Sequence, residues 1–169
     1  MIFCFVILHY KNLEETIKCV SSIKDNYLNY NIVIVDNASN DGTGEILCQM
    51  YKDYSTINVL IQEEAKGFSY GNNLGIEFAK QNFDPDFLII CNNDVQFVDQ
   101  DLYLKICQIY KETNFSVMGP DVYYVKMSEH QSPFRNEWMR EKETLEEIAY
   151  YQKRLSNRLR FDFFFQNTI

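Results

Sequence analysis

The sequence contains little glycine, proline or tryptophan, and it has no long apolar run. Its 169 residues include six glycines, three prolines and one tryptophan. No apolar segment approaches the ~20 residues that a membrane-spanning helix needs. The apolar start, residues 1–8, has no basic leader and is predicted to be a first strand rather than a signal peptide. No Pro/Gly/Ser-rich linker divides the chain, so a single domain with a real core is expected.

Cysteines are also few, and basic residues are outnumbered. The five cysteines are widely spaced, and none forms a C-x-x-C pair. Neither a zinc site nor a disulfide framework is therefore expected, and a reducing cytoplasm fits this usage. The net charge of −8 argues against nucleic acid as a partner. An anionic substrate would need a local counter-charge, such as a metal ion.

Short apolar runs alternate closely with helix-like stretches along most of the chain. Such alternation predicts right-handed βαβ units and a mostly parallel sheet covered on both faces, which is a three-layer α/β/α sandwich. Asn12 is expected to cap the first helix, with Glu15 completing a capping box. The predicted strands are 2–8, 32–35, 57–61, 87–91 and 115–118, and the predicted helices are 13–27, 43–54, 67–81 and 99–112.

Residues after about 126 have a different character. A loop is predicted over 128–137 and a helix over 138–160, with a basic end and an apolar tail at 161–165. One interpretation is an amphipathic helix at a membrane surface. The other is a helix packed on the body of the protein or on a second copy in a homodimer. Packing is favoured, because the apolar stripe is moderate and the first half of the helix is acidic.

Polar clusters follow two of the predicted strands. Asp36-Asn37 ends one strand, and Asn92-Asn93-Asp94 ends another. The carboxyl ends of parallel strands share one edge of a sheet, so these groups can converge on one crevice. Taken singly, such residues are more often turn formers. Asp94 is a hard oxygen ligand suited to Mg²⁺ or Mn²⁺, which usually take only one or two protein carboxylates. No dinucleotide or Walker glycine pattern is present.

Several sequence blocks together resemble glycosyltransferase family 2, over about residues 2–125. Each block alone is weak, but their order and spacing are specific. The resemblance implies the GT-A nucleotide-sugar-binding fold and transfer of a sugar from a nucleoside diphosphate to an acceptor hydroxyl, with inversion. The blocks are the first strand leading into Tyr10–Asn12, IVIVDNASNDGTGE, KGFSYGNNLGIEFA, FLIICNNDVQF and Met118-Gly119-Pro120.

The resemblance also implies site residues. Asp36 matches the carboxylate that contacts the nucleotide base, and Asn92-Asn93-Asp94 matches the D-x-D motif, with Asp94 holding the Mn²⁺ or Mg²⁺ that bridges the donor diphosphate. Asn92 departs from the acidic first position, which faces the ribose, although an amide can still bond a ribose hydroxyl. Further donor contacts are implied for the backbone of Leu8, His9 and Tyr10, and for Lys66, Gly67 and Asn73.

Two of these residues keep a second interpretation. The His9 side chain is expected to be a hydrogen-bonded structural group rather than a ligand. Lys66 could neutralise phosphate, but an exposed loop lysine is the commoner case. No catalytic residue is assigned, because nothing after Pro120 matches the acidic motif that supplies the family's general base.

The predicted division is therefore a nucleotide-sugar-binding GT-A domain over 1–127 and a partial acceptor region over 128–169. The first hypothesis is a cytoplasmic transferase, with the inner membrane face as an alternative location. It would use a saccharide or lipid-linked acceptor in cell-envelope polysaccharide or glycoconjugate synthesis. The second is a truncated or non-catalytic nucleotide-sugar-binding module. A nucleotidyltransferase ranks last, because residues 9–12 are not a basic, glycine-rich loop.

Overall fold

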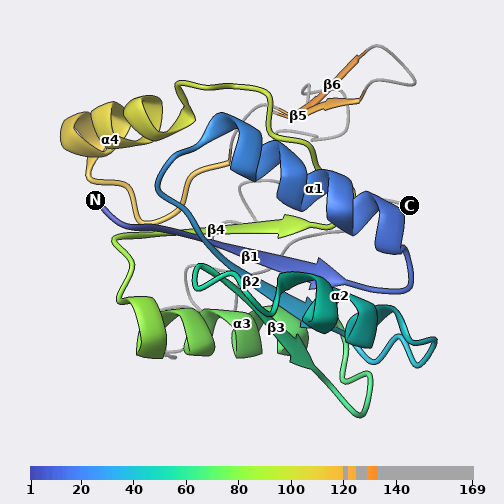
Figure 1. Ribbon diagram of the computed structural model, residues 1–169. Coiled ribbons are helices and arrows are strands. Elements are labelled where there is room, and N and C mark those ends of the chain that lie inside the picture. Colours follow the sequence, from blue (N-terminus) through green and yellow to red (C-terminus); the bar gives the residue numbers. More distant parts are fainter. Residues whose placement is uncertain (120–121, 125–128, 133–169) are drawn as a thin grey trace, which may run out of the picture. The chain divides into compact units, whose positions relative to one another are not determined.

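The computed structural model describes residues 1–119, 122–124 and 129–132 (Figure 1). The chain divides into two compact units, Met1–Tyr103 and the residues from Leu104 onward. The first unit contains the four-stranded sheet and its covering helices. Among the helices that the structure describes, none combines the length and the apolar character needed to cross a membrane.

The sheet of the first unit is entirely parallel. Its order is β3-β2-β1-β4, so the chain moves outward from β1 in one direction and then crosses to the other side of β1. All seven residues of β1 are buried, as are five of the six in β2. This burial explains their unbroken apolar runs. The strands are β1 Phe3–His9, β2 Asn31–Asp36, β3 Ile57–Ile61 and β4 Phe87–Asn92 (Figure 1).

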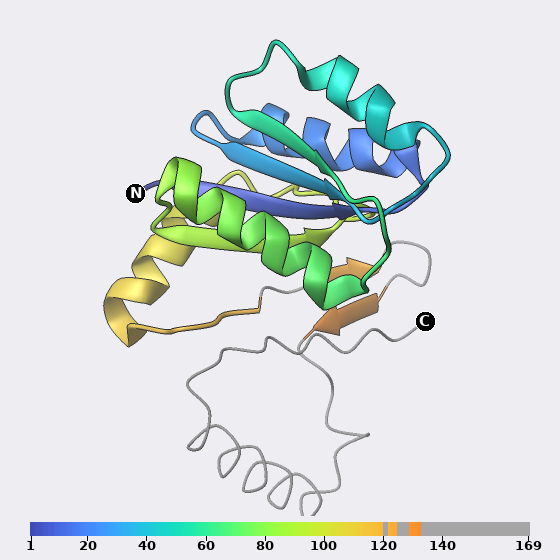
Figure 2. The ribbon, with the colours of Figure 1, turned by 90° about the horizontal axis from the view of Figure 1, so that it is seen from below.

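Helices cover both faces of this sheet, and the alternation of side chains along the strands defines two cores. Phe5, Ile7 and Ile34 point to one face, where they pack with α1 and α2. Val6 and Val35 point to the other face, where α3 lies. Figure 2 shows α1 and α2 on one side of the strands and α3, in green, on the other. These helices are α1 Leu13–Asn26, α2 Thr43–Tyr51 and α3 Phe68–Phe83.

Much of the aromatic content gathers in one cluster on the α1 face. Phe3 stacks on Tyr103 with ring centroids 3.9 Å apart, and Tyr103 stacks on Tyr27 at 4.6 Å. Phe97 meets Phe5 edge-on at 5.1 Å. The Tyr27 hydroxyl donates a hydrogen bond to the Asp99 carbonyl oxygen at 2.8 Å. These contacts attach the chain that follows β4 to β1 and α1.

Helix α3 approaches the sheet closely because glycines face it. A Cβ atom on Gly75 would lie 2.5 Å from Val6 Cγ1 and 3.0 Å from Val35 Cγ2. A Cβ on Gly71 would lie 2.5 Å from Leu8 Cδ1. Only hydrogen at these positions allows the observed packing. The start of α3 is thereby held against the carboxyl end of β1.

The second unit and the helix ends differ from the sequence expectations. Residues 115–118 form no strand, and Val117 is 60% exposed. Instead, short strands β5 Val122–Tyr124 and β6 Glu129–Ser132 pair antiparallel, although the second falls within the predicted loop 128–137. Helix α2 ends at Tyr51 rather than Tyr54. Helix α4 is Leu102–Thr113. The predicted helix 138–160 and the tail 161–165 lie outside the described residues, and the 1–127 boundary stays a prediction.

Candidate functional site

The carboxyl ends of β2, β1 and β4 lie side by side, as the sequence clusters predicted. Leu8 of β1 is paired with Val35 on one side and Asn92 on the other, and His9 is paired with Asp36. Because the order reverses at β1, the topological switch point of the sheet lies between β1 and β4. In open α/β sheets, ligands bind outside the carboxyl ends at such a point.

At the end of β2, the Asp36 carboxylate is 2% exposed and is turned into the loop that follows it. Its Oδ1 accepts hydrogen bonds from the Ser39 backbone N–H, at 3.1 Å, and from the Ser39 hydroxyl. Its Oδ2 lies against Gly44, where any side chain would collide with it. The Ser39 hydroxyl oxygen also accepts from the Lys11 backbone N–H at 2.8 Å. Asp36 therefore organises the loops that follow β1 and β2.

At the end of β1, His9 is fully buried and bonded at both ring nitrogens. Nδ1 lies 2.7 Å from Thr16 Oγ1, and Nε2 lies 2.8 Å from Thr43 Oγ1. Burial lowers the pKa of His9, although Asp36 and Asp41 oppose the shift. The imidazole is thus a structural group, in line with its interpretation from sequence. The next side chain, Tyr10, is 50% exposed, with Lys11 Nζ 5.0 Å from its ring centroid.

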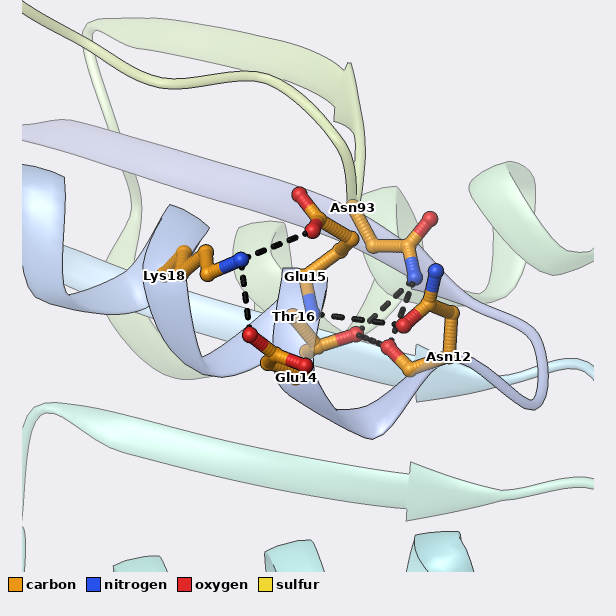
Figure 3. Close-up of polar contacts among 6 residues, drawn as sticks. All are labelled: Asn12, Glu14, Glu15, Thr16, Lys18 and Asn93. Atoms are coloured by element: carbon orange, nitrogen blue, oxygen red, sulfur yellow. Dashed lines mark hydrogen bonds and ion pairs between the residues drawn. The ribbon is translucent and has the colours of Figure 1, made fainter.

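At the end of β4, Asn92 and Asp94 are exposed, while Asn93 is half-buried. Figure 3 shows the Asn93 amide turned toward the start of α1. Its Nδ2 donates to Thr16 Oγ1 at 3.0 Å and to the Asn12 carbonyl oxygen at 3.3 Å. Asn93 thus ties the turn that contains Asp94 to α1.

The start of α1 forms only half of the predicted capping box. Asn12 Oδ1 accepts from the Glu15 backbone N–H at 3.4 Å, which confirms Asn12 as the cap. The Glu15 carboxylate does not reach back to Asn12, because it pairs with Lys18 at 3.0 Å. Lys18 also pairs with Glu14 at 2.8 Å (Figure 3). These exposed ion pairs stabilise the fold little.

The start of α3 lies near the carboxyl end of β1, on the face of the sheet opposite α1 and α2. Gly67 has φ +95°, a conformation that favours glycine, and it precedes the helix. Lys66 is exposed, with Nζ 5.2 Å from the Tyr70 ring centroid. Asn73 points outward and is exposed. Lys66, Gly67 and Asn73 are therefore accessible beside the strand ends.

Two side chains that sequence reasoning missed stand out here. Gln62 follows β3, and Asn72 lies beside Asn73 on α3; they are 7% and 5% exposed. Gln62 Oε1 and Asn72 Oδ1 have no hydrogen-bond partner among the residues that the structure describes. Gln62 Nε2 donates to Asn37 Oδ1 at 3.3 Å. A signal was present, since Gln62 is a polar residue directly after a mostly apolar run, as Asp36 is.

Oxygen ligands at this edge fit a magnesium-like ion only in part. Asn92, the last residue of β4, supplies an amide, and Asp94, in the turn that follows, supplies a carboxylate; both residues are exposed. Within the described residues, no three His, Cys, Asp or Glu side chains cluster as metal ligands. Mg²⁺ is often held by one or two carboxylates, with water and substrate phosphates completing its shell. The donor set thus suits a metal that arrives with a phosphate ligand.

These features define an α/β protein that presents polar groups from three parallel strands at a topological switch point. The model of the family described as glycosyl transferase family 2 matches residues 4–167. The chain therefore belongs to this family, which confirms the resemblance found in the sequence.

Individual relatives agree with this assignment. The chain is 28% identical over 185 residues to glycosyltransferase GlyA of Streptococcus pneumoniae serotype 4, covering 93% of the chain and 25% of GlyA. It is 30% identical over 127 residues to glycosyltransferase GlyG of the same organism, covering 66% of the chain and 42% of GlyG. The chain thus spans less than half the length of these relatives.

A solved structure shows the same fold. Mannosyltransferase PcManGT from Pyrobaculum calidifontis, in complex with GDP-Man and Mn²⁺, is similar with a TM-score of 0.55 at 15% identity. The match covers 64% of this chain and 32% of that one. It confirms the predicted α/β/α sandwich.

Proposed function

We propose that this chain binds a nucleoside-diphosphate sugar at the carboxyl edge of its sheet and serves the transfer of that sugar to an acceptor hydroxyl, with inversion. The observation that supports this most is the convergence of three strand ends, bearing Asp36, Tyr10 and Asp94, at the switch point. A nucleotide laid across this edge would place its base near β2 and its diphosphate near β4. Family membership supports the same assignment.

The base end of the donor would lie beside the backbone of Leu8–Tyr10. The Asp36 carboxylate is buried and its Oδ1 already accepts two hydrogen bonds from Ser39, so contact with a base would require the Ser39 hydroxyl or the loop around it to move. Gln62 Oε1, which has no partner within the described part of the chain, could accept a further hydrogen bond from the nucleotide sugar. A buried acceptor without a partner costs about 1–3 kcal/mol, which a ligand N–H or O–H would relieve.

The diphosphate end would lie between the start of α3 and the turn after β4. Lys66, Gly67 and Asn73 would flank the nucleotide, and Asn92 would bond the ribose. Asp94 would hold Mn²⁺ or Mg²⁺, which when bound neutralises charge on the departing nucleoside diphosphate. Asn93 keeps its structural contact with α1 in this arrangement.

The acceptor side supports a second candidate. Among the residues that the structure describes, no carboxylate is assigned as the general base, and the chain covers a quarter of GlyA. A donor-binding module without turnover of its own is therefore the alternative. An assay of donor consumption by phosphorus NMR separates the two, since only the transferase releases nucleoside diphosphate in the presence of an acceptor.

Titration calorimetry with UDP, GDP, dTDP and CDP, each with and without MnCl₂, tests the donor site. We expect at least one nucleotide to bind, and to bind more tightly with Mn²⁺. Asp94→Asn should remove the metal dependence, whereas Asp25→Asn, an exposed carboxylate near the other end of α1, should not. Equal affinity with and without Mn²⁺ would exclude the metal role, and no binding by any nucleotide would exclude the donor site.

The wider setting of the reaction belongs to the same proposal. A cytoplasmic location, a role in cell-envelope polysaccharide or glycoconjugate synthesis, and a saccharide or lipid-linked acceptor fit a nucleotide-sugar enzyme. Contact with the inner membrane face and homodimer formation depend on residues 138–165, outside the described part. Sedimentation with anionic liposomes at low salt tests the first, and sedimentation equilibrium tests the second.

A further inference from the structure

His9 joins three elements at the carboxyl edge through its two ring nitrogens. It is the last residue of β1, Thr16 lies in α1, and Thr43 is the first residue of α2. Nδ1 lies 2.7 Å from Thr16 Oγ1 and Nε2 lies 2.8 Å from Thr43 Oγ1. His9 and Thr16 are both fully buried. A polar side chain in such a position specifies the arrangement of its neighbours, provided that every hydrogen bond is satisfied.

The hydroxyl of each threonine also lies within hydrogen-bond distance of another side chain. Thr43 Oγ1 lies 2.6 Å from Asp41 Oδ1, in the loop before α2. Thr16 Oγ1 lies 3.0 Å from Asn93 Nδ2, after β4 (Figure 3). Five side chains therefore form one continuous series of hydrogen bonds. In order, they are Asn93, Thr16, His9, Thr43 and Asp41.

The direction of this series follows from counting protons. An amide nitrogen only donates, an ionised carboxylate only accepts, and a hydroxyl has one proton. Thr16 Oγ1 also lies 3.1 Å from the Asn12 carbonyl oxygen. Suppose that the Thr16 hydroxyl donated to the Asn12 carbonyl oxygen and the Thr43 hydroxyl donated to Asp41. Both ring nitrogens of His9 would then have to donate to the threonine oxygens, as in an imidazolium ion. Burial disfavours that ion and lowers the pKa of His9. For neutral His9, one hydroxyl must donate to the ring.

The hydroxyl that donates to the His9 ring is that of Thr16. The Thr43 contact with Asp41 is charge-assisted and short, and it lowers the pKa of Asp41. The Asn12 carbonyl oxygen, by contrast, already accepts from Asn93 Nδ2 and from the Thr16 backbone N–H, each at 3.3 Å. It therefore loses little when the Thr16 hydroxyl points elsewhere. Thr16 then donates to Nδ1, and Nε2–H donates to Thr43.

We propose that His9 is a positioning residue, held as the Nε2–H tautomer, and that the directed series of hydrogen bonds from Asn93 to Asp41 fixes the turn that contains Asp94. The consequence for binding rests on the proposed function, in which Asp94 holds the metal. Residues that hydrogen-bond to a metal ligand without touching the metal commonly lower the metal affinity when they are removed. Here Thr43 would act on Asp94 through His9, Thr16 and Asn93, without touching the metal.

The tautomer is tested without any ligand. Long-range proton–nitrogen correlation NMR distinguishes a protonated from an unprotonated ring nitrogen, and His130→Gln assigns the His9 signals because the chain has two histidines. At neutral pH we expect a protonated Nε2 and an unprotonated Nδ1. A protonated Nδ1, alone or together with Nε2, would overturn the proposal. Because no nucleotide is present, this result is independent of the donor site.

The positioning role is tested with Thr43→Val, which removes the hydroxyl at nearly constant volume, and Thr43→Ser, which keeps it. We expect Thr43→Val to shift the side-chain amide resonances of Asn93, and Thr43→Ser to restore them. Mn²⁺-dependent nucleotide affinity should fall about tenfold in Thr43→Val, as for other residues behind a metal ligand, and recover in Thr43→Ser. Unshifted Asn93 resonances in a folded Thr43→Val protein would refute the series. Shifted resonances with unchanged metal affinity would refute only the link to Asp94.

Discussion

Replacing Gly75 by alanine should destabilise the protein, even though alanine is the better helix former. The new methyl group would lie 2.5 Å from Val6 Cγ1 and 3.0 Å from Val35 Cγ2, and both valines are fully buried in the central strands. Overpacking of this kind typically costs about 1–3 kcal/mol, whereas alanine for glycine within a helix returns about 1 kcal/mol. We therefore expect a net loss of about 1 kcal/mol in the free energy of unfolding.

Urea denaturation followed by far-ultraviolet circular dichroism measures this loss. The decisive control is Val6→Ala, alone and combined with Gly75→Ala. If α3 is held close by the missing side chain, the space vacated by Val6 accepts the new methyl group. The double variant should then be more stable than the sum of the single effects predicts, by about 1 kcal/mol. Additive losses would refute the close approach of α3, and a stabilised Gly75→Ala protein would refute it outright.

Three further predictions follow from individual contacts. Burial holds the pKa of His9 below its unfolded value of about 6.5. The unfolded chain therefore binds a proton at His9 that the folded protein resists, and the free energy of unfolding should decrease as the pH falls below about 6.5. A His9→Asn protein should lack that slope, and parallel stability curves for the two proteins would contradict the assignment. Gln62→Met should change the free energy of unfolding by no more than about 1 kcal/mol, because removing an acceptor that has no partner among the described residues offsets the loss of the hydrogen bond to Asn37 Oδ1; calorimetry should nevertheless show weaker nucleotide binding, and unchanged binding would exclude Gln62 from the site. Tyr27→Phe should cost about 1 kcal/mol in thermal unfolding through the lost bond to the Asp99 carbonyl oxygen, and a neutral result would mean that water replaces it.

The parallel sheet was predictable because each of its strands is an apolar run that needs no information from elsewhere in the chain. The same criterion gave a wrong prediction at 115–118, where the structure has no strand. The residues there are apolar enough, but a strand exists only with a partner, and Val117 is instead 60% exposed. Helix α2 ends early for a local reason. Tyr51 is buried and the Tyr54 backbone N–H bonds to its carbonyl oxygen, so the chain turns there.

The site was predictable at the level of strand ends but not of side-chain direction. Asn72 and Asn73 are chemically identical neighbours, and only the rotation of α3 turns the first inward and the second outward. Asp36 was recognised as a carboxylate at the right edge, yet its oxygens face Ser39 and Gly44. Both outcomes depend on how closely a helix or loop approaches the sheet. The spacing of glycines indicates that an approach is close, but it does not give the distance or the direction of each side chain.

The contacts of His9 join parts of the carboxyl edge that are far apart in the sequence. Its partners are 7 and 34 residues away in the sequence, and the Asn93–Thr16 contact joins residues 77 apart. Each residue is unremarkable in its own segment: a strand end, a helix interior, a helix start and a turn. The hydrogen bonds among them form only when the parallel sheet brings the ends of β1, β2 and β4 side by side. A base-side loop organised by Asp36 and Ser39 and a turn bearing Asp94 are then connected through one buried imidazole. A change that reverses the His9 tautomer should therefore disturb both ends of the proposed donor site at once, as Thr43→Val should through the same series.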